Sequence, residues 1–152
     1  MAYWLMKSEP AELSIDALKA RPRGTAQWDG VRNYQARNFM RDDMKKGDQI
    51  LFYHSSCPEP GIAGIAQVVR EAYPDHTAFD PKSIYFDPKS SPDKVTWMMV
   101  DVKFVRRMKR LISLHELKAE PRLDGFALLR RGNRLSVMPV TKAHWDIALG
   151  LE

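Results

Sequence analysis

The chain has 152 residues, of which 44% are hydrophobic and 28% are charged, and its formal net charge is +5. These proportions are typical of a globular domain and exclude a disordered or fibrous chain. No apolar run approaches about 18 residues, so we expect no membrane-spanning helix, and residues 1–10 lack the apolar region of a cleavable signal peptide. Cys57 is the only cysteine, which excludes an internal disulfide and suits a reducing compartment. We therefore expect one domain over residues 1–152, located in the cytoplasm, with no membrane partner.

The positive charge is concentrated in residues 102–134. This segment holds ten Lys and Arg residues against three acidic ones, a net charge of +7, whereas the rest of the chain carries −2. One basic face on a nearly neutral body is typical of proteins that bind a phosphate backbone, although a solvated surface can have the same composition. The predicted phosphate contacts are Arg106, Arg107, Lys109 and Arg110. Replacing the three arginines by Glu should flatten the salt dependence of nucleic-acid binding.

The first third of the chain predicts a strand, a short helix and a loop. Residues 2–7 form an apolar, aromatic run that ends before Pro10, which favours a buried strand. Ser14 is in position to cap a helix that continues to about Ala20. Residues 28–34 contain Gly30 and few apolar residues, and we expect a loop there.

A second helix and a pair of strands follow. The helix should begin at Asn33 or Tyr34 and stop before Gly47, whose backbone freedom suits a left-handed end. Residues 49–54 alternate between two faces, and residues 61–69 should pair with them as an antiparallel strand. The glycines of this second strand indicate either a group packed against bare backbone or a bulge.

Residues 74–94 contain four prolines and little periodicity, which predicts a long loop. The alternation over residues 95–105 predicts a further strand. Ser113 and Glu116 form a capping-box pattern for a short helix, residues 134–140 read as a last strand, and Thr141 should cap a C-terminal helix. Strands with short helices and no regular βαβ order indicate an α+β fold with a curved or barrel-like sheet.

The sequence contains none of the common catalytic motifs, and its four histidines are dispersed. His76 and Asp80 are four residues apart, a spacing that suits metal ligands on a helix, but they flank a predicted loop. We therefore expect no bound metal and no cofactor. We also expect no catalytic residue, because no catalytic motif is present. His54 and Ser55 are adjacent in a strand and should point to opposite faces. We therefore expect His54 and Ser55 to serve in structural hydrogen bonds.

Several aromatic and polar residues instead resemble the components of a base-binding pocket. Trp28 lies in a loop before a helix, where a core tryptophan is less expected, whereas Trp4, Trp97 and Trp145 suit packing. Polar groups fall at the ends of strands or at the start of a helix, in residues 7–9, 32–33 and 53–55. Aromatic faces for stacking and mixed donors and acceptors for base edges are the groups that an extruded base requires.

Seven segments in order, covering nearly the whole chain, resemble the hallmark segments of the EVE domain family. They are residues 3–10 (YWLMKSEP), 28–38 (WDGVRNYQARN), 52–55 (FYHS), 61–66 (GIAGIA), 72–75 (AYPD), 100–102 (VDV) and 134–141 (RLSVMPVT). The resemblance implies a PUA-like fold, a small β-barrel with helices at its rim, related to YTH and ASCH domains. It also implies a reader of modified nucleobases in RNA or DNA, because family members are regarded as such readers.

By this resemblance, the pocket draws on ten residues: Lys7, Ser8, Glu9, Trp28, Arg32, Asn33, Tyr34, Tyr53, His54 and Ser55. Trp28 occupies the matching loop and is the candidate stacking face. Tyr85 and Phe86 lie in the long loop where YTH relatives contribute further cage residues. On this view Trp28→Ala abolishes base binding and leaves the fold intact, and the basic segment supplies phosphate contacts beside the pocket.

We therefore expect a non-catalytic domain that takes a modified base, for example a methylated one, into an aromatic pocket. Two other classes of function stay open. An enzyme acting on a modified nucleotide would use His54, Glu9 or Asp101 as acid or base. An interaction module would take a small molecule or a peptide in the same pocket. The sequence leaves the modification, the choice of RNA or DNA and the oligomeric state undetermined, although a monomer is plausible.

Overall fold

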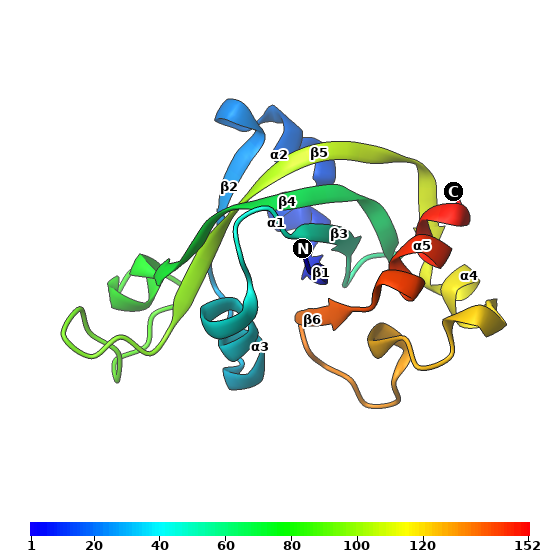
Figure 1. Ribbon diagram of the computed structural model, residues 1–152. Coiled ribbons are helices and arrows are strands. Elements are labelled where there is room, and N and C mark those ends of the chain that lie inside the picture. The colour runs from blue at the N-terminus through cyan, green and yellow to red at the C-terminus, as the bar shows by residue number, and fades with distance from the viewer.

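A computed structural model describes all residues, 1–152, as a curved six-stranded sheet with short helices around it (Figure 1). The strands are β1 (Tyr3–Ser8), β2 (Thr25–Trp28), β3 (Gln49–His54), β4 (Gly61–Pro74), β5 (Met98–Ser113) and β6 (Val137–Val140). They lie in the order β2-β5-β4-β3-β1-β6, and β1 runs parallel to β3 while the other neighbours are antiparallel. The predicted α+β class with a curved sheet is confirmed.

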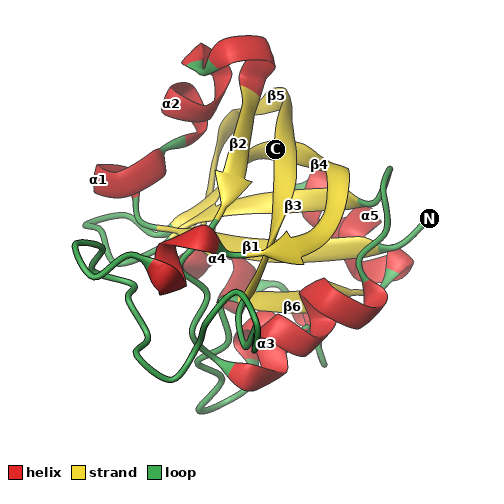
Figure 2. Ribbon diagram, turned by 90° about the vertical axis from the view of Figure 1, so that its left-hand side faces the viewer, coloured by secondary structure: helices red, strands yellow, loops and turns green.

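The helices are short and surround the sheet (Figure 2). They are α1 (Pro10–Leu13), α2 (Ile15–Ala20), α3 (Tyr34–Asn38), α4 (Leu114–Ala119) and α5 (Lys142–Gly150). A π-helical turn at Phe39–Asp43 extends α3, and 3-10 turns occur at Pro22–Gly24, His76–Phe79, Pro121–Leu123 and Ala127–Leu129. None of these helices has the length and apolar character needed to cross a membrane.

Side chains cap these helices as the sequence predicts. Ser14 Oγ accepts a hydrogen bond from Ala17 N at 3.0 Å, and Thr141 Oγ1 accepts one from His144 N at 3.1 Å. Ser113 and Glu116 form a complete capping box at the start of α4. These bonds satisfy amides that the first turn of a helix leaves free, which is why such short helices have defined starts.

The sheet buries apolar side chains on both of its faces. Along β3, Ile50 and Phe52 belong to one core cluster, and Leu51 and Tyr53 belong to the other. All four side chains are buried, as the alternation in residues 49–54 predicts for a strand that is covered on both sides.

Gly64 confirms both interpretations of the glycines in the second strand. A Cβ at this position would lie 2.6 Å from Ile15 Cδ1 and 2.8 Å from Arg106 O, so a side chain has no room there. The pairing of β4 with β5 also shifts register between Ile62 and Gly64. Gly64 therefore allows α2 to pack against the sheet at a point where β4 bends.

The boundaries of several predicted elements are wrong. β2 lies where we expected part of a loop, and Trp28 ends it. β5 begins at Met98 and continues through the basic residues to Ser113, while β6 is shorter than predicted and starts at Val137. The second helical segment ends at Asp43, and Gly47, with φ 97°, lies in the turn that follows.

Candidate nucleic-acid interface

A groove opens where β1, β2 and the long loop at residues 75–97 meet, and we call it the β1–β2 groove. Its volume is about 1090 Å³. β1 and β3 are parallel, so their ends lie side by side, and Ser55 N donates to Ser8 O at 3.0 Å there. The lining residues are Lys7, Ser8, Glu9, Glu12, Leu13, Arg21, Pro22, Thr25, Ala26, Gln27, Trp28, Asp29, Gly30, Val31, Arg32, Ser55, Ser56, Ile84, Tyr85, Arg134 and Ser136.

The β1–β2 groove brings together six of the ten residues predicted for the pocket. These are Lys7, Ser8, Glu9, Trp28, Arg32 and Ser55. Asn33, Tyr34, Tyr53 and His54 do not line it. The groove residues that the sequence did not predict come from α1, from β2 and the segments on either side of it, from the loops at residues 56 and 84, and from the segment before β6. Their placement depends on long-range pairing.

Trp28 is a core residue as well as part of the groove wall. Only 7% of it is exposed, and its ring meets the ring of Phe52 edge-on with the centroids 5.6 Å apart. Because β2 is a strand, Ala26 and Trp28 share its inward face, and both are buried. The expectation that Trp28 can be truncated without affecting the fold conflicts with this burial.

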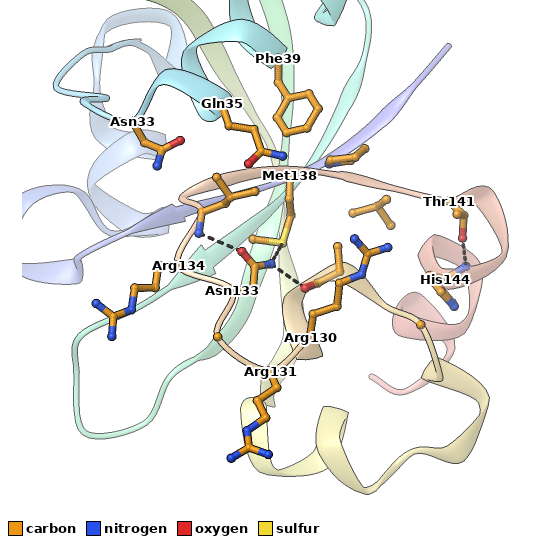
Figure 3. Close-up of a pocket in the computed structure, with 16 residues that line it drawn as sticks. Asn33, Gln35, Phe39, Arg130, Arg131, Asn133, Arg134, Met138, Thr141 and His144 are labelled. Atoms are coloured by element: carbon orange, nitrogen blue, oxygen red, sulfur yellow. Dashed lines mark hydrogen bonds between the residues drawn. The ribbon is translucent and has the colours of Figure 1, made fainter.

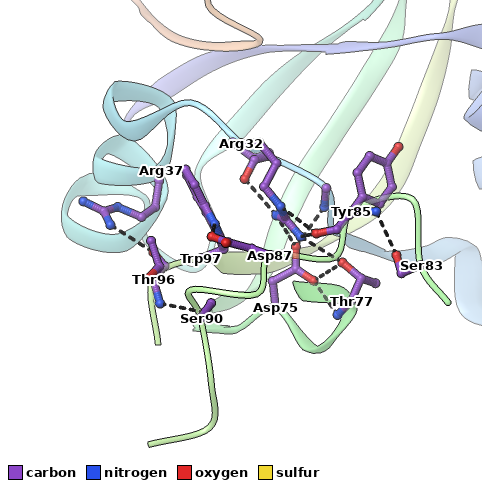
Figure 4. A network of polar contacts seen from close by, with 12 residues as sticks. Arg32, Arg37, Asp75, Thr77, Ser83, Tyr85, Asp87, Ser90, Thr96 and Trp97 are labelled. Carbon is purple, nitrogen blue, oxygen red and sulfur yellow. Dashed lines mark hydrogen bonds and ion pairs between the residues drawn. The ribbon is translucent and has the colours of Figure 1, made fainter. Parts of the chain in front are cut away.

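Arg32 uses all of its hydrogen-bond donors within the protein (Figure 4). Nε and Nη2 donate to Tyr85 O, Nη1 donates to Val31 O and Asp75 Oδ2, and Nη2 also donates to Thr77 Oγ1, at distances from 2.8 to 3.2 Å. An arginine has five N–H donors, and these five bonds occupy them all. Arg32 therefore ties the long loop to the segment after β2, and it has no donor left for the edge of a base.

Asp75 is the buried partner of Arg32. Burial by itself would raise the pKa of its carboxyl, but hydrogen bonds from Thr77, the amide of Gly30 and Arg32 outweigh burial and hold that pKa below its ordinary value. The Gly30 amide donates to Asp75 Oδ2 at 2.8 Å, and Asp75 itself is 0% exposed. One carboxylate thus fixes both the turn after β2 and the start of the long loop.

Tyr85 forms the loop side of the groove and lies against Gly30. A Cβ at residue 30 would lie 2.6 Å from Tyr85 Cζ, and the φ of Gly30 is +79°. Only glycine combines this backbone conformation with such a close approach. On its other side, the Tyr85 hydroxyl donates to Glu12 Oε2 at 3.1 Å, which connects the loop to α1. Tyr85 therefore lines the groove, whereas Phe86 does not.

The four predicted pocket residues outside the groove have other structural roles. Tyr53 is buried on the opposite face of the sheet from Phe52. His54 Nε2 accepts a hydrogen bond from Ile15 N at 3.1 Å, which confirms a structural role for His54. Tyr34 is 61% exposed and stacks on the buried ring of Trp97, with ring centroids 4.9 Å apart. Asn33 Oδ1 accepts from Ala36 N at 3.0 Å and caps α3.

Five charged side chains of the groove, those of Lys7, Glu9, Arg21, Asp29 and Arg134, make no hydrogen bond or ion pair within the protein. Burial lowers the pKa of the Lys7 ammonium below its ordinary value. Burial, followed by the nearby charge of Asp75, raises the pKa of the Asp29 carboxyl. Glu9 is exposed at the rim. The groove thus offers both an ammonium donor and carboxylate acceptors to a ligand.

The arginines predicted to contact phosphates are paired with carboxylates. Arg106 forms a 2.7 Å ion pair with Glu152, Arg107 a 3.1 Å pair with Asp16, and Arg110 a 2.8 Å pair with Glu116. Lys109 is exposed, and its backbone amide also binds Glu152. Three of the four predicted phosphate contacts therefore have a carboxylate partner, and the Lys109 ammonium has none.

The residues considered for an acid–base enzyme do not form one site. Glu9 lines the groove, His54 is bonded to the start of α2, and Asp101 accepts a hydrogen bond from the hydroxyl of Tyr73 on the neighbouring strand. No group of three or more His, Cys, Asp or Glu side chains is arranged to hold a metal ion.

The family model described as the EVE domain matches residues 2–151. The chain belongs to the EVE domain family. Thymocyte nuclear protein 1 of Homo sapiens is 49% identical over an alignment of 168 positions, gaps included. The alignment covers 99% of this chain and 74% of that protein. Such a match over the whole length confirms the resemblance found in the sequence segments.

Solved structures of EVE relatives have the same fold. A protein from Pseudomonas putida is 55% identical with a TM-score of 0.94, and the match covers 99% of both chains. Human thymocyte nuclear protein 1, solved in complex with DNA containing 5-methylcytosine, is 48% identical with a TM-score of 0.94, over 99% of this chain and 97% of that one. The Mmi1 YTH domain, at 16% identity and a TM-score of 0.55, shares the fold alone.

Proposed function

We propose that this EVE domain is a non-catalytic reader of DNA that binds a modified cytosine, of the 5-methylcytosine type, in the β1–β2 groove. The observation that carries the proposal is the human relative in complex with DNA containing 5-methylcytosine, at 48% identity and a TM-score of 0.94. The groove of about 1090 Å³ has room for an extruded nucleotide. RNA with a modified base is the alternative ligand within the same class.

The polar groups of the groove suit the edge of a cytosine. Cytosine presents an exocyclic amino group as a donor, and Asp or Glu carboxylates are its usual acceptors. Asp29 and Glu9 offer such carboxylates, and Lys7 offers an ammonium for a carbonyl oxygen of the base. Thymine carries the same methyl group as 5-methylcytosine but presents an acceptor in place of the amino group. A carboxylate beside that position therefore favours 5-methylcytosine over thymine.

The methyl group would contact the apolar part of the wall, which includes Trp28, Val31 and Leu13. Burying one methyl group contributes about 0.8 kcal/mol, which corresponds to only a few-fold preference over unmodified cytosine. Base extrusion costs a few kcal/mol and stacking returns about 1–3 kcal/mol per base. A modest preference for the methylated base, supported by shape and edge contacts, is the quantitative expectation.

The proposal is tested by fluorescence anisotropy with short single-stranded oligonucleotides that differ in one base. We expect the tightest binding for 5-methylcytosine, a few-fold weaker binding for cytosine and weaker binding again for thymine. Equal affinity for the three oligonucleotides would overturn the proposal. Turnover of a modified nucleotide, followed by mass spectrometry of the nucleosides, would support the enzyme alternative instead.

In this proposal, residues 1–152 act as one domain without catalysis. Arg32 and Trp28 support the groove, while Asp29, Glu9 and Lys7 contact the base edge and Tyr85 contributes an aromatic side chain to the wall. The cytoplasmic location inferred from the single cysteine stays a prediction, and imaging of a tagged protein in its host tests it.

A further inference from the structure

A second groove adjoins the first, and its charge is of one sign only. Its volume is about 600 Å³, and we call it the arginine groove (Figure 3). The lining residues are Asn33, Gln35, Phe39, Gly125, Ala127, Arg130, Arg131, Gly132, Asn133, Arg134, Leu135, Met138, Pro139, Val140, Thr141 and His144. Three arginines line it and no Asp or Glu does, so its surface is cationic, whereas the β1–β2 groove also contains carboxylates.

The three arginines of this groove are free to bind a ligand. Arg130, Arg131 and Arg134 are exposed, and none of them makes an ion pair or a side-chain hydrogen bond. Figure 3 shows the side chain of Arg130 reaching into the groove and those of Arg131 and Arg134 extending outward from the same loop. They therefore differ from the arginines of β5, which have carboxylate partners.

The loop that carries these arginines has a defined conformation. Asn133 N donates to Arg130 O at 3.1 Å and closes a turn around Gly132, whose φ is +76°. Asn133 Nδ2 donates to Ala127 O at 2.6 Å, and its Oδ1 accepts from Leu135 N at 2.9 Å. A loop held in this way loses less conformational entropy on binding than a free one.

Arg134 lines both grooves, so the two grooves meet at its side chain. A strand whose base enters the β1–β2 groove must have a phosphate within a few ångströms on either side of that base. Three carboxylates of the β1–β2 groove (Glu9, Glu12 and Asp29) repel phosphates, although Lys7 and Arg21 also line it, whereas no carboxylate opposes the three arginines of the arginine groove. The arginine groove is therefore the electrostatically favoured path for the backbone as it leaves the base.

We propose that the arginine groove binds the phosphodiester backbone of the DNA strand whose modified base lies in the β1–β2 groove, with Arg130, Arg131 and Arg134 as the phosphate contacts. This proposal rests on the proposed function. It assigns the phosphate contacts to the loop before β6, whereas the sequence predicted them on β5. Asn33 and Gln35, on the opposite rim, are placed to donate to phosphate or sugar oxygens of the same strand.

The test compares the salt dependence of binding in two triple variants that lose the same number of positive charges. One is R130Q/R131Q/R134Q, and the other is R106Q/R107Q/R110Q on β5. Each phosphate contact contributes about 0.7 to 0.9 to the slope of log Kd against log salt, so the loop variant should lose about 2 to 3 from that slope. Between about 50 and 200 mM salt, that difference corresponds to roughly 20- to 40-fold in affinity. The β5 variant should keep most of the wild-type slope.

Two results would overturn the proposal: a wild-type slope in the loop variant, or an equal loss of slope in the β5 variant. The melting temperature of each variant shows that the fold is retained. The nucleoside 5-methyl-2′-deoxycytidine, which carries no phosphate, separates this proposal from the proposed function. R130Q/R131Q, which keeps Arg134, should bind that nucleoside as the wild type does. Absence of nucleoside binding by the wild type, together with equal affinity for methylated and unmethylated DNA, would contradict the proposed function whatever the slopes are.

Discussion

The ring of Tyr85 lies directly on the backbone of Gly30, at a distance that excludes any side chain at residue 30. A Cβ there would lie 2.6 Å from Tyr85 Cζ and 2.8 Å from both Cε atoms. Through this contact the long loop at residues 75–97 becomes one wall of the β1–β2 groove. The position of that wall therefore depends on a single glycine.

Gly30→Ala should displace Tyr85 and weaken the binding of DNA that contains 5-methylcytosine. Gly47→Ala is the matched control, because Gly47 also has a positive φ, of 97°, but no atom lies within 4 Å of the place where its Cβ would be. Both variants incur backbone strain, and Gly30→Ala should lose more unfolding free energy because of the steric clash. The double variant Gly30→Ala/Tyr85→Ala should recover part of the unfolding free energy that the clash removes from Gly30→Ala. Equal losses in Gly30→Ala and Gly47→Ala, measured by urea unfolding, would contradict this role of Gly30 in the wall.

Asp75→Ala should destabilise the protein, because it removes the carboxylate that pairs with the buried side of Arg32 and that accepts the hydrogen bond of the Gly30 amide. We expect a loss of about 2–4 kcal/mol, below the full cost of a wholly buried pair because Arg32 keeps some contact with water. The pKa of Asp75 is lowered in the folded state, so its contribution is complete above the unfolded pKa of about 3.9 and is lost as the pH falls through the folded value. Urea unfolding at neutral and acidic pH measures both effects, and a variant as stable as the wild type at neutral pH would be the contrary result.

Trp28→Ala should lower the unfolding free energy by about 3–5 kcal/mol, because it creates a cavity beside Phe52. Loss of binding in that variant would therefore not identify Trp28 as a stacking face. Trp28→Phe retains an aromatic ring and should therefore lose less unfolding free energy than Trp28→Ala. Unchanged stability of Trp28→Ala in thermal unfolding would mean that Trp28 is not part of the core.

His54 should make stability depend on pH in the weakly acidic range. Burial lowers its pKa from the ordinary 6.5, and only the neutral ring accepts the hydrogen bond from Ile15 N. Since the folded-state pKa is depressed, this contribution is present above pH 6.5 and is lost as the pH falls toward the folded value. His54→Gln should show a smaller decrease in unfolding free energy than the wild type on acidification. If the unfolding free energy of both proteins falls equally on acidification, the pH dependence comes from titratable groups other than His54.

Asp29→Asn should change which base is preferred. The carboxylate only accepts hydrogen bonds, whereas the amide can also donate to the oxygen that thymine presents. The preference for 5-methylcytosine over thymine should fall by at least about fivefold, or about 1 kcal/mol of the 1–3 kcal/mol that a base-edge contact supplies. Glu9→Gln is measured beside it, because Glu9 also lines the groove. A loss of preference in Glu9→Gln alone would assign the contact to Glu9, and an unchanged preference in both variants would contradict a carboxylate contact with the amino group.

The sequence predicted the elements whose signals are local. β3 matches its predicted bounds because its apolar residues alternate, and Ser113 caps α4 because the capping box needs only residues close in sequence. β2 was missed because four residues carry too little periodicity, and pairing with β5 fixes them as a strand. The ion pair of Arg106 with Glu152 spans 46 positions, so the charge pattern alone could not reveal it.

The candidate site was predicted in part for the same reason. The resemblance to the EVE family identified the ends of β1 and β2, and those ends line the groove. It also grouped Tyr53, His54 and Ser55, although neighbours in a strand point to opposite faces and cannot all line one groove. Tyr85 was named only through the likeness to YTH domains, and it lines the groove. The contribution of Arg134 depends on how the loop before β6 folds back, which no local pattern encodes.

Entry of a modified cytosine into the β1–β2 groove can be observed in solution by nuclear magnetic resonance. The isotope-labelled protein is titrated with 5-methyl-2′-deoxycytidine, and the amide chemical shifts are followed residue by residue. We expect shifts that are largest at Ser8, Asp29, Gly30, Ser55 and Tyr85 and small along the second half of β5. No saturable shift at the groove residues, or shifts centred on Arg106–Arg110, would contradict base binding in this groove.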